Sequence, residues 1–203
     1  TTSHSRDVTM TKPFPFSSDQ VPPVWDPKGE KTLCHFLEGA RLYEKKEQHP
    51  DGRVRDFCLI DCKNWVQCIA LTEHKEIVMV SQFRAGSHSI TLELPGGGIE
   101  ADEAPLLGAE RELQEETGYT GQPARLIGSY NPNPAMQTNL VFFYLIKNCQ
   151  RTHLTHFDPD EDLRTHLIPI SQVDALILDG HIQHAITACG LLLFKSYYNS
   201  ATS

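Results

Sequence analysis

The sequence predicts an α+β fold that combines mixed β-sheets with a central helix and a C-terminal helix, preceded by a β-rich N-terminal segment. Three observations predict this class. Residues 31–94 consist of short apolar stretches separated by turn residues, which is typical of consecutive strands. Apolar side chains at helical spacing follow the glycines at residues 96–98 and occur again near the C-terminus. The length of 203 residues fits one large domain or two small ones.

The predicted strands follow from alternation, β-branched residues and the turns between them. A turn at residues 49–52 separates two of the stretches, and the polar residues 73–75 separate two apolar ones that fit a hairpin. Pro95 stops the next strand because it lacks the backbone N–H that a ladder needs. The predicted strands cover residues 40–44, 54–60, 65–71, 76–83, 90–94, 125–130, 140–146 and 164–169.

The helices are predicted from capping residues and apolar stripes. Asp102 can cap the central helix, Pro105 is tolerated in its first turn, and Gly118 suits its C-terminus. Ser171 can cap a short helix that ends near Leu178. The predicted buried stripes are Leu106, Ala109 and Leu113 in the central helix, and Ile182, Ala185, Ile186, Cys189 and Leu193 in the last helix.

The charge balance limits the possible partners. Lys and Arg number 18 and Asp and Glu number 26, which gives a formal net charge of −8. An acidic chain is unsuited to non-specific nucleic-acid binding and to an anionic membrane surface, since both need cationic side chains. No apolar run approaches the roughly 20 residues that cross a bilayer, and residues 1–23 lack the apolar core of a signal peptide. We therefore expect neither nucleic acid nor membrane as a partner.

The six cysteines do not form paired C-x-x-C motifs, so a zinc site is not expected. A chain of this length can bury its core without disulfides. Most of the cysteines lie in apolar segments, which favours buried, reduced thiols in a cytoplasmic protein.

Three carboxylates gather on one flank of the central helix. At about 100° per residue, Glu112, Glu115 and Glu116 fall within an arc of about 100° beside the apolar stripe. Like charges at this spacing repel, and Arg111 can offset only part of their charge. A hard divalent cation such as Mg²⁺, which prefers oxygen ligands and retains substrate phosphates, would stabilise the cluster. The alternative for the carboxylates alone is a solvated acidic helix face.

Residues 97–119 contain a long motif that is more specific than the carboxylates. Its fixed positions are Gly97-x5-Glu103-x7-Arg111-Glu112-Leu113-x-Glu115-Glu116-x-Gly118-Tyr119. This stretch resembles the complete motif of the Nudix hydrolases, G-x5-E-x7-R-E-U-x-E-E-x-G-U, where U is bulky and apolar. Tyr119, bulky but hydroxylated, is the one soft departure.

The resemblance implies a strand–loop–helix unit inside an α/β/α sandwich of mixed sheets. It also implies metal-dependent hydrolysis of a nucleoside diphosphate linked to another moiety. The implied metal ligands are the carbonyl of Gly96 and the carboxylates of Glu112, Glu115 and Glu116, with Mg²⁺ as the expected ion and Mn²⁺ possible. By the motif, Arg111 would orient the glutamates and Glu103 would support the site.

Weaker similarity over residues 75–195 points to the ADP-ribose and nucleoside-diphosphate-sugar pyrophosphatases. In that group the general base usually comes from an acidic loop outside the motif, where Glu161 is the matching position and Asp160 the reserve. With Glu161, the expected catalytic residues are Glu103, Arg111 and Glu115. The alternative for the acidic loop is a surface turn without a catalytic role.

Substrate contacts are expected outside the motif. The planar fork of Arg84 suits a phosphate, and Glu93 leads into the glycine loop, although Glu93 could instead pair with a neighbouring arginine. Trp25 could stack on a nucleobase, even across a dimer, or simply pack the N-terminal segment. Pro134 and Met136 belong to the loop after the motif, where Asn131, Asn133 and Gln137 could also line a sugar pocket.

The sequence therefore predicts a divalent-metal-dependent pyrophosphatase that splits ADP-ribose or a nucleoside diphosphate sugar into a nucleoside monophosphate and a sugar phosphate. The alternatives are a hydrolase of nucleoside triphosphates or dinucleoside polyphosphates and a non-catalytic nucleotide sensor. We expect a flexible tail at residues 1–22, an N-terminal β segment at residues 23–62 that could exchange between subunits of a homodimer, and a hydrolase domain at residues 63–203.

Overall fold

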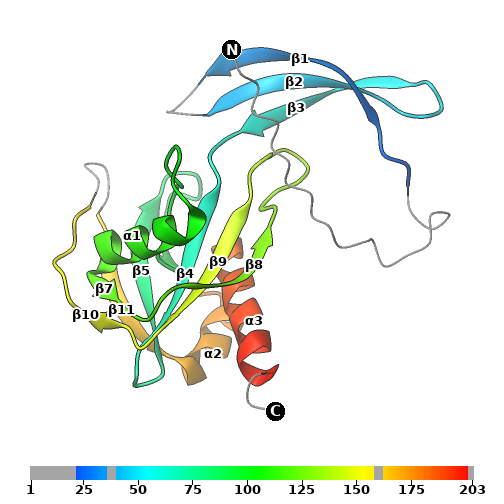
Figure 1. Cartoon of the computed structure of the whole chain (residues 1–203). Helices are drawn as coiled ribbons and strands as arrows, with labels where there is room; N and C mark the ends of the chain where they lie inside the picture. The colour runs from blue at the N-terminus through cyan, green and yellow to red at the C-terminus, as the bar shows by residue number, and fades with distance from the viewer. Residues whose placement is uncertain (1–21, 36–39, 158–161, 201–203) are drawn as a thin grey trace.

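The computed structural model describes residues 22–35, 40–157 and 162–200, so almost all of the predicted tail lies outside the described residues. The elements alternate between strands and a few helices, as the sequence predicts for an α+β fold (Figure 1). The strands are β1 Asp26–His35, β2 Arg41–Gln48, β3 Val54–Asp61, β4 Trp65–Leu71, β5 Glu76–Arg84, β6 Ser89–Glu93, β7 Tyr119–Thr120, β8 Arg125–Tyr130, β9 Val141–Lys147, β10 Gln150–Arg151 and β11 Arg164–Pro169. The helices are α1 Pro105–Thr117, η2 Ile170–Gln172, α2 Val173–Leu178 and α3 Ala185–Ser200.

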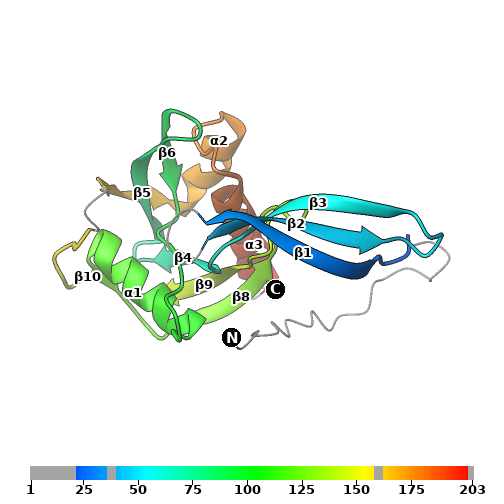
Figure 2. The same ribbon diagram turned by 90° about the horizontal axis from the view of Figure 1, so that it is seen from above.

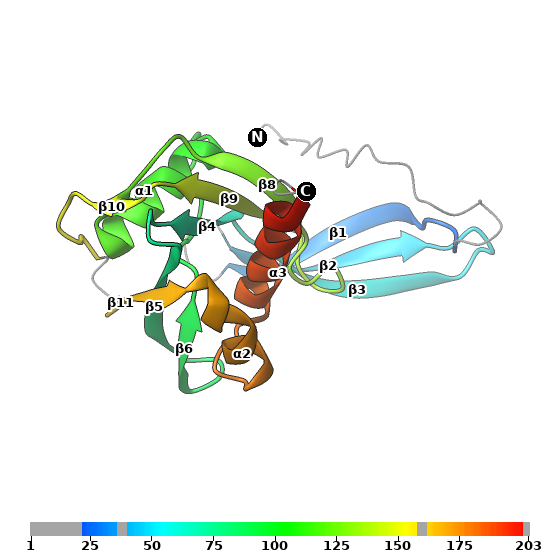
Figure 3. The same cartoon turned by 90° about the horizontal axis from the view of Figure 1, so that it is seen from below.

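The main sheet is mixed and lies between two helical layers. Its strand order is β11-β5-β4-β9-β8, and β6 adds to β5 beside this path. Strands β4 and β9 run parallel, whereas the other pairs are antiparallel. Helix α1 lies on one side of the sheet and α3 on the other (Figure 3). The result is the α/β/α sandwich that the motif resemblance implies.

Alternating side chains of β4 explain why both faces need a helix. Cys68 and Ala70 are buried in the cluster that contains Leu113 of α1. Ile69 and Leu71 are buried in the opposite cluster, which contains Phe194 of α3. Because successive side chains point to opposite faces, a strand with apolar side chains on both faces must be covered on both sides.

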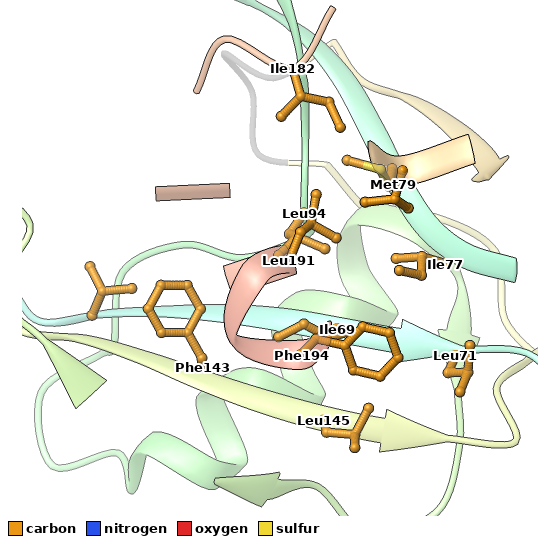
Figure 4. Packing of buried hydrophobic residues seen from close by; sticks show 12 residues of the cluster. Ile69, Leu71, Ile77, Met79, Leu94, Phe143, Leu145, Ile182, Leu191 and Phe194 are labelled. Atoms are coloured by element: carbon orange, nitrogen blue, oxygen red, sulfur yellow. The ribbon is translucent and has the colours of Figure 1, made fainter. Parts of the chain in front are cut away.

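The larger core cluster lies between the sheet and α3 (Figure 4). Phe143 is its bulkiest fully buried side chain. A Cβ atom at Gly190 would come within 2.8 Å of that ring, so the glycine allows α3 to approach β9 closely. Loss of the Phe143 ring would leave a cavity, which typically costs about 3–5 kcal/mol of unfolding free energy.

The N-terminal segment forms a separate three-stranded antiparallel sheet in the order β1-β2-β3. This sheet projects away from the helices and the main sheet (Figures 1 and 2). Strands β2 and β3 agree with the prediction; β1 falls within the predicted β segment, but no individual strand was placed there. Every residue of β1 is exposed, so its sequence has no buried face to reveal it, and it forms by pairing along β2.

Of the two predicted caps of helix α1, the C-terminal one is confirmed and the N-terminal one is wrong. Gly118 ends it as expected, in the left-handed region at φ 75°, and donates its N–H to the Gln114 carbonyl at 2.8 Å. The predicted cap Asp102 is wrong, because it occupies a turn at φ 64° and the extended Ala104 precedes the helix. Leu106 is exposed rather than buried. Ala109 and Leu113 are buried as predicted, Glu112 and Glu116 are buried beside them, and Leu106 lies in the first turn of the helix.

The start of α2 and the buried face of α3 differ from prediction. Ser171 lies inside η2 instead of capping α2, which begins at Val173. Of the predicted stripe, Ile182 is buried just before α3, Ile186 and Leu193 are partly buried against the same core, and Ala185 and Cys189 are exposed. The fully buried residues of α3 are Thr187, Gly190, Leu191 and Phe194. This stripe has the same three-and-four spacing, so periodicity alone could not choose between the two faces.

All six cysteines are free, which agrees with reduced thiols, but only Cys68 and Cys149 are buried. Burial raises the pKa of Cys149 to about 12. Cys34 and Cys58 are exposed on the N-terminal sheet, so the expectation of buried thiols fails there. No helix among the described residues is long and apolar enough to span a membrane.

Candidate active site

A change of partner along β5 opens the site. At its start, Ile77 and Val78 pair with β4, but from Val80 onward β5 pairs with β6 instead. The start of β4 is then bonded to the glycine loop, since the Val66 N–H donates to the Gly97 carbonyl at 2.9 Å and the Cys68 N–H donates to the Pro95 carbonyl at 2.8 Å. The start of β4 and the end of β5 therefore diverge on either side of this loop.

A cavity of about 640 Å³ lies at this divergence, within the size range of small-molecule sites. Its walls come from β4, the end of β5 with the turn after it, the glycine loop, α1 and the start of α3. It is lined by Trp65, Val66, Gln67, Gln82, Arg84, Ala85, Gly86, Ser87, Thr91, Gly96, Gly97, Gly98, Glu116, Gln183, His184, Ala185 and Ile186.

Arg111 gathers the carboxylates of the motif. It donates from Nε and Nη2 to both oxygens of Glu103, at 2.8 and 3.0 Å. Its Nη1 donates to Glu112 and to Glu115, each at 2.9 Å, and Nη2 also donates to the Gly98 carbonyl at 3.2 Å. One guanidinium thus fixes three carboxylates and the glycine loop. Its single positive charge offsets one of their three negative charges.

Two glycines leave room for these carboxylates. A Cβ atom at Gly97 would lie 2.8 Å from the carboxylate atoms of Glu112. A Cβ atom at Gly108 would lie 2.9 Å from an oxygen of Glu103. The glycines of the loop and of the first helical turn therefore let charged groups approach the backbone, which explains why the motif needs a glycine at position 97.

The donors of this site fit a hard divalent cation. Glu116 is 3% exposed and its Oε2 accepts the Gly96 N–H at 2.9 Å, which brings a buried carboxylate against the loop. The carbonyls of Pro95, Gly97 and Gly98 accept hydrogen bonds from described residues. The Gly96 carbonyl accepts no hydrogen bond from the described residues and so can serve as a metal ligand. Carboxylate and carbonyl oxygens are the ligands of Mg²⁺. Among the described residues no three His, Cys, Asp or Glu side chains are grouped so that they could hold a metal ion by themselves, so a cation here would also need oxygen ligands such as backbone carbonyls.

The ion pairs shift the titration of their members. Hydrogen bonds from Arg111 hold the pKa of Glu103 below its ordinary value, and they outweigh the opposing effect of partial burial. The same hydrogen bond with Glu103 is the main cause that raises the pKa of Arg111. The carboxylate and the guanidinium therefore stay charged together over a wider pH range than either would alone.

Arg84 and Glu93 form a second ion pair at the cavity. Arg84 donates from Nε and Nη2 to the two oxygens of Glu93 at 2.8 and 2.7 Å, and Thr91 donates to the same carboxylate at 2.5 Å. Burial raises the pKa of Glu93, but the hydrogen bonds from Arg84 and Thr91 outweigh it, so the net pKa is lowered. Arg84 lines the cavity, whereas Glu93 is 1% exposed behind it.

Other expected site residues lie away from this cavity or outside the described residues. Trp25 packs in the N-terminal sheet, with its ring centroid 4.9 Å from His49 and 5.7 Å from Phe57. Pro134 and Met136 are exposed in the loop before β9, where the Met136 carbonyl accepts a hydrogen bond from β3. None of the three lines the cavity of the same chain. Glu161 lies outside the described residues.

The structure adds cavity residues that the sequence analysis missed. Trp65 and Gln67 lie on β4, Gln82 lies on β5 and His184 just before α3, so these residues share no local spacing. Gln67 nevertheless carried a signal, because it is a polar residue inside the otherwise apolar strand β4. It is only 6% exposed, and a buried polar residue in such a strand is informative.

A cavity beside a glycine loop, an arginine that gathers carboxylates and an α/β/α sandwich together define a hydrolase of the Nudix type. The NUDIX domain family model matches residues 63–188, more than half of the chain. The chain belongs to the Nudix family and is a Nudix hydrolase.

Similar proteins agree with this assignment. The chain is 29% identical over 137 residues to the ADP-ribose pyrophosphatase of Bacillus subtilis (strain 168), which covers 68% of this chain and 74% of that protein. It is 31% identical over 172 residues to a CMP-5'-(N-acetyl-N-hydroxy-3-aminopropyl)phosphonate hydrolase of Streptomyces rubellomurinus (strain ATCC 31215), covering 83% and 81% of the two chains. The crystal structure of an ADP compounds hydrolase superposes with a TM-score of 0.77 at 15% identity, over 90% of this chain and 98% of that one, and shows the shared fold.

Proposed function

We propose that this Nudix hydrolase cleaves the pyrophosphate bond of ADP-ribose or of a related nucleoside diphosphate sugar, with a divalent metal ion as cofactor. The products are a nucleoside monophosphate and a sugar phosphate. The observation that carries the proposal is the Arg111 cluster, in which Glu103, Glu112 and Glu115 are fixed beside the glycine loop and next to the cavity. The similarity to an ADP-ribose pyrophosphatase supports the substrate class.

Each residue of the cluster has a proposed part in this reaction. Glu112, Glu115 and Glu116, with the Gly96 carbonyl, would hold Mg²⁺ or Mn²⁺. A bound ion of this kind would supply charge stabilisation to the phosphates and would lower the pKa of a water. Arg111 and Glu103 keep the glutamates in place, and Glu161 is the proposed general base.

Substrate positioning falls to residues around the cavity. Glu93 orients the fork of Arg84 at the cavity wall, where a guanidinium can bind phosphate oxygens. Trp25, Pro134 and Met136 remain proposed substrate contacts, and they do not line this chain's own cavity.

A homodimer would give these outlying residues a role. Its proposed interface is the exposed N-terminal sheet, which would place Trp25 near the partner's cavity. Sedimentation analysis should then give twice the monomer mass, and a monomer would contradict this arrangement. The free cysteines support a reducing compartment such as the cytoplasm.

A substrate panel tests the reaction. The purified chain should be incubated with ADP-ribose, other nucleoside diphosphate sugars, nucleoside triphosphates and dinucleoside polyphosphates, each with Mg²⁺ or Mn²⁺, and the products identified by mass. AMP with ribose phosphate from ADP-ribose is the expected result. Inorganic pyrophosphate from a triphosphate as the preferred reaction would contradict the proposal, and binding without turnover would indicate a nucleotide sensor.

A further inference from the structure

One histidine of the cavity wall is held from behind by a polar network. His184 precedes α3, and its Nδ1 lies 3.0 Å from Thr187 Oγ1 and 3.2 Å from an oxygen of Glu93. Thr187 is itself fixed, because its Oγ1 accepts the Leu94 N–H at 3.1 Å and donates to Gln67 Oε1 at 3.4 Å. The network ties the start of α3 to β4 and to the strand that enters the glycine loop.

The network determines which ring nitrogen carries the proton. Thr187 directs its own hydrogen to Gln67, so its oxygen is an acceptor toward His184. The Glu93 carboxylate also favours a hydrogen on the nitrogen that faces it. A proton on Nδ1 satisfies both neighbours, and in a neutral imidazole Nε2 is then an acceptor. Burial lowers the pKa of His184 and outweighs the opposing charge of Glu93, which agrees with a neutral ring.

The Nε2 edge of the His184 ring faces the cavity. Both polar contacts of the His184 ring with described residues are made by Nδ1, and the residue lines the cavity with 26% of its side chain exposed. Gln67, whose Oε1 accepts from Thr187, offers its amide nitrogen as a donor at the same cavity. An acceptor and a donor on neighbouring side chains match a hydroxyl group, which both donates and accepts.

We propose that His184 is a substrate-binding residue whose Nε2 accepts a hydrogen bond from a hydroxyl of the sugar attached to the diphosphate. This inference rests on the proposed function. The diphosphate belongs at the glycine-loop end of the cavity, beside Glu116, and the attached moiety then extends toward α3. The cavity wall suits a polyhydroxylated group, because it carries several side-chain amides and hydroxyls. These are Gln67, Gln82, Ser87, Thr91 and Gln183.

Two substitutions separate a substrate contact from a purely structural role. His184→Asn places an amide near the Nδ1 position, so it can still face Glu93 and Thr187 but has no atom at the Nε2 position. His184→Gln reaches the Nε2 position and gives up the Nδ1 donor. The exposed His181, which does not line the cavity, supplies the matched control His181→Asn. Thermal unfolding of each variant checks that it is folded.

The expected result for His184→Asn is a rise in KM for ADP-ribose of about five- to tenfold, the range for loss of one hydrogen bond between neutral groups, with kcat within about twofold. The inhibition constant of ADP, which lacks the attached sugar, should stay within about twofold of wild type. His184→Gln should recover part of the loss in KM, and His181→Asn should match wild type. If His184→Asn kept the wild-type KM while His184→Gln raised it, the ring would only position Glu93, and the proposal would be overturned.

The affinity for ADP-ribose, measured by calorimetry in magnesium-free buffer, separates this inference from the proposed function. If His184→Asn binds ADP-ribose more weakly than wild type but wild type cleaves no nucleotide sugar, the result would contradict the proposed function alone. Cleavage with equal KM in wild type and His184→Asn would contradict the His184 inference alone. An equal loss of ADP and ADP-ribose affinity would assign His184 to the nucleotide half and overturn it as well.

Discussion

Two arginines of this chain each bind more than one carboxylate, yet they belong to regions of opposite character. Arg41 in the N-terminal sheet pairs with Glu30 at 3.0 Å and with Asp61 at 3.2 Å. Arg111 in the active site pairs with Glu103, Glu112 and Glu115 at 2.8–2.9 Å. The Arg41 pairs join three neighbouring strands of an exposed sheet, whereas the Arg111 pairs lie between a helix and a loop that borders a cavity.

Burial makes the difference between the two. The two arginines are about equally exposed, and so are some of their partners, since Glu115 is 41% and Asp61 29% exposed. The difference lies in Glu103 and Glu112, which are 14% and 12% exposed, against 49% for Glu30. Water screens the exposed pair, and such pairs contribute little to stability. The buried carboxylates cannot rely on water, so each needs a defined partner. Similar ion pairs therefore hold together a surface sheet in one region and a reactive site in the other.

The largest expected effect tests whether the buried carboxylates serve catalysis. Glu116→Gln keeps the size of the side chain and a hydrogen-bond acceptor for the Gly96 N–H, but it removes the charge. Turnover of the preferred nucleotide sugar should fall by at least about a hundredfold. The matched control is Glu100→Gln on the exposed turn before α1, which should keep wild-type kinetics. Unchanged turnover in Glu116→Gln would remove the assignment of the site.

The next effect concerns the space that the loop leaves for a carboxylate. Gly97→Ala would place a Cβ atom 2.8 Å from the carboxylate of Glu112 and push that group away. A misplaced catalytic group typically costs about ten- to a hundredfold in rate, so kcat should fall by that amount while thermal unfolding changes little. Gly98→Ala should cost less, because its nearest neighbour would be Lys63 Cδ at 3.7 Å. Equal losses in the two variants would contradict this explanation.

A stability measurement sharpens the contrast further. Glu103→Gln removes one side of a two-point charged hydrogen bond with Arg111, which should lower the unfolding free energy by about 1–3 kcal/mol at pH 7. Since Arg111 lowers the pKa of Glu103 in the folded state, this stabilisation is complete above the ordinary carboxyl value and is lost as pH falls through the lowered one. Urea unfolding at pH 7 and at about pH 3.5 should show the gap between variant and wild type shrinking in acid.

The sequence predicted the parts of the site that are local in the chain. The spacing of residues 97–118 placed a glycine loop, a helix and its carboxylates together, and the structure shows that Arg111 bonds to Glu103, Glu112 and Glu115. A helix fixes the relative positions of residues three and four apart, so such a motif determines its own geometry. The exposure of Leu106 was not predictable, because it shares a helix face with the buried Leu113 and periodicity alone does not show which turns of a helix are covered.

The parts that depend on tertiary structure could not be predicted. The cavity exists because β5 exchanges β4 for β6, and no local pattern encodes that exchange. Gln67 and His184 are 117 positions apart and meet only through Thr187. The bounds of β1, inside the predicted N-terminal β segment, could not be placed for the opposite reason, since it buries nothing and depends on its backbone pairing with β2.

The smallest expected effect completes the comparison of the two arginines. Glu30→Gln removes one carboxylate from Arg41, as Glu103→Gln does from Arg111, but Arg41 keeps Asp61 and the solvent replaces the lost contact. The unfolding free energy should change by less than about 1 kcal/mol, and the change should shrink further at high salt because exposed charges are screened. Urea unfolding of both variants at low and high salt gives the measurement. If Glu30→Gln cost as much as Glu103→Gln, burial could not be what separates the exposed sheet from the active site, and the Arg41 cluster would have to be a structural centre in its own right.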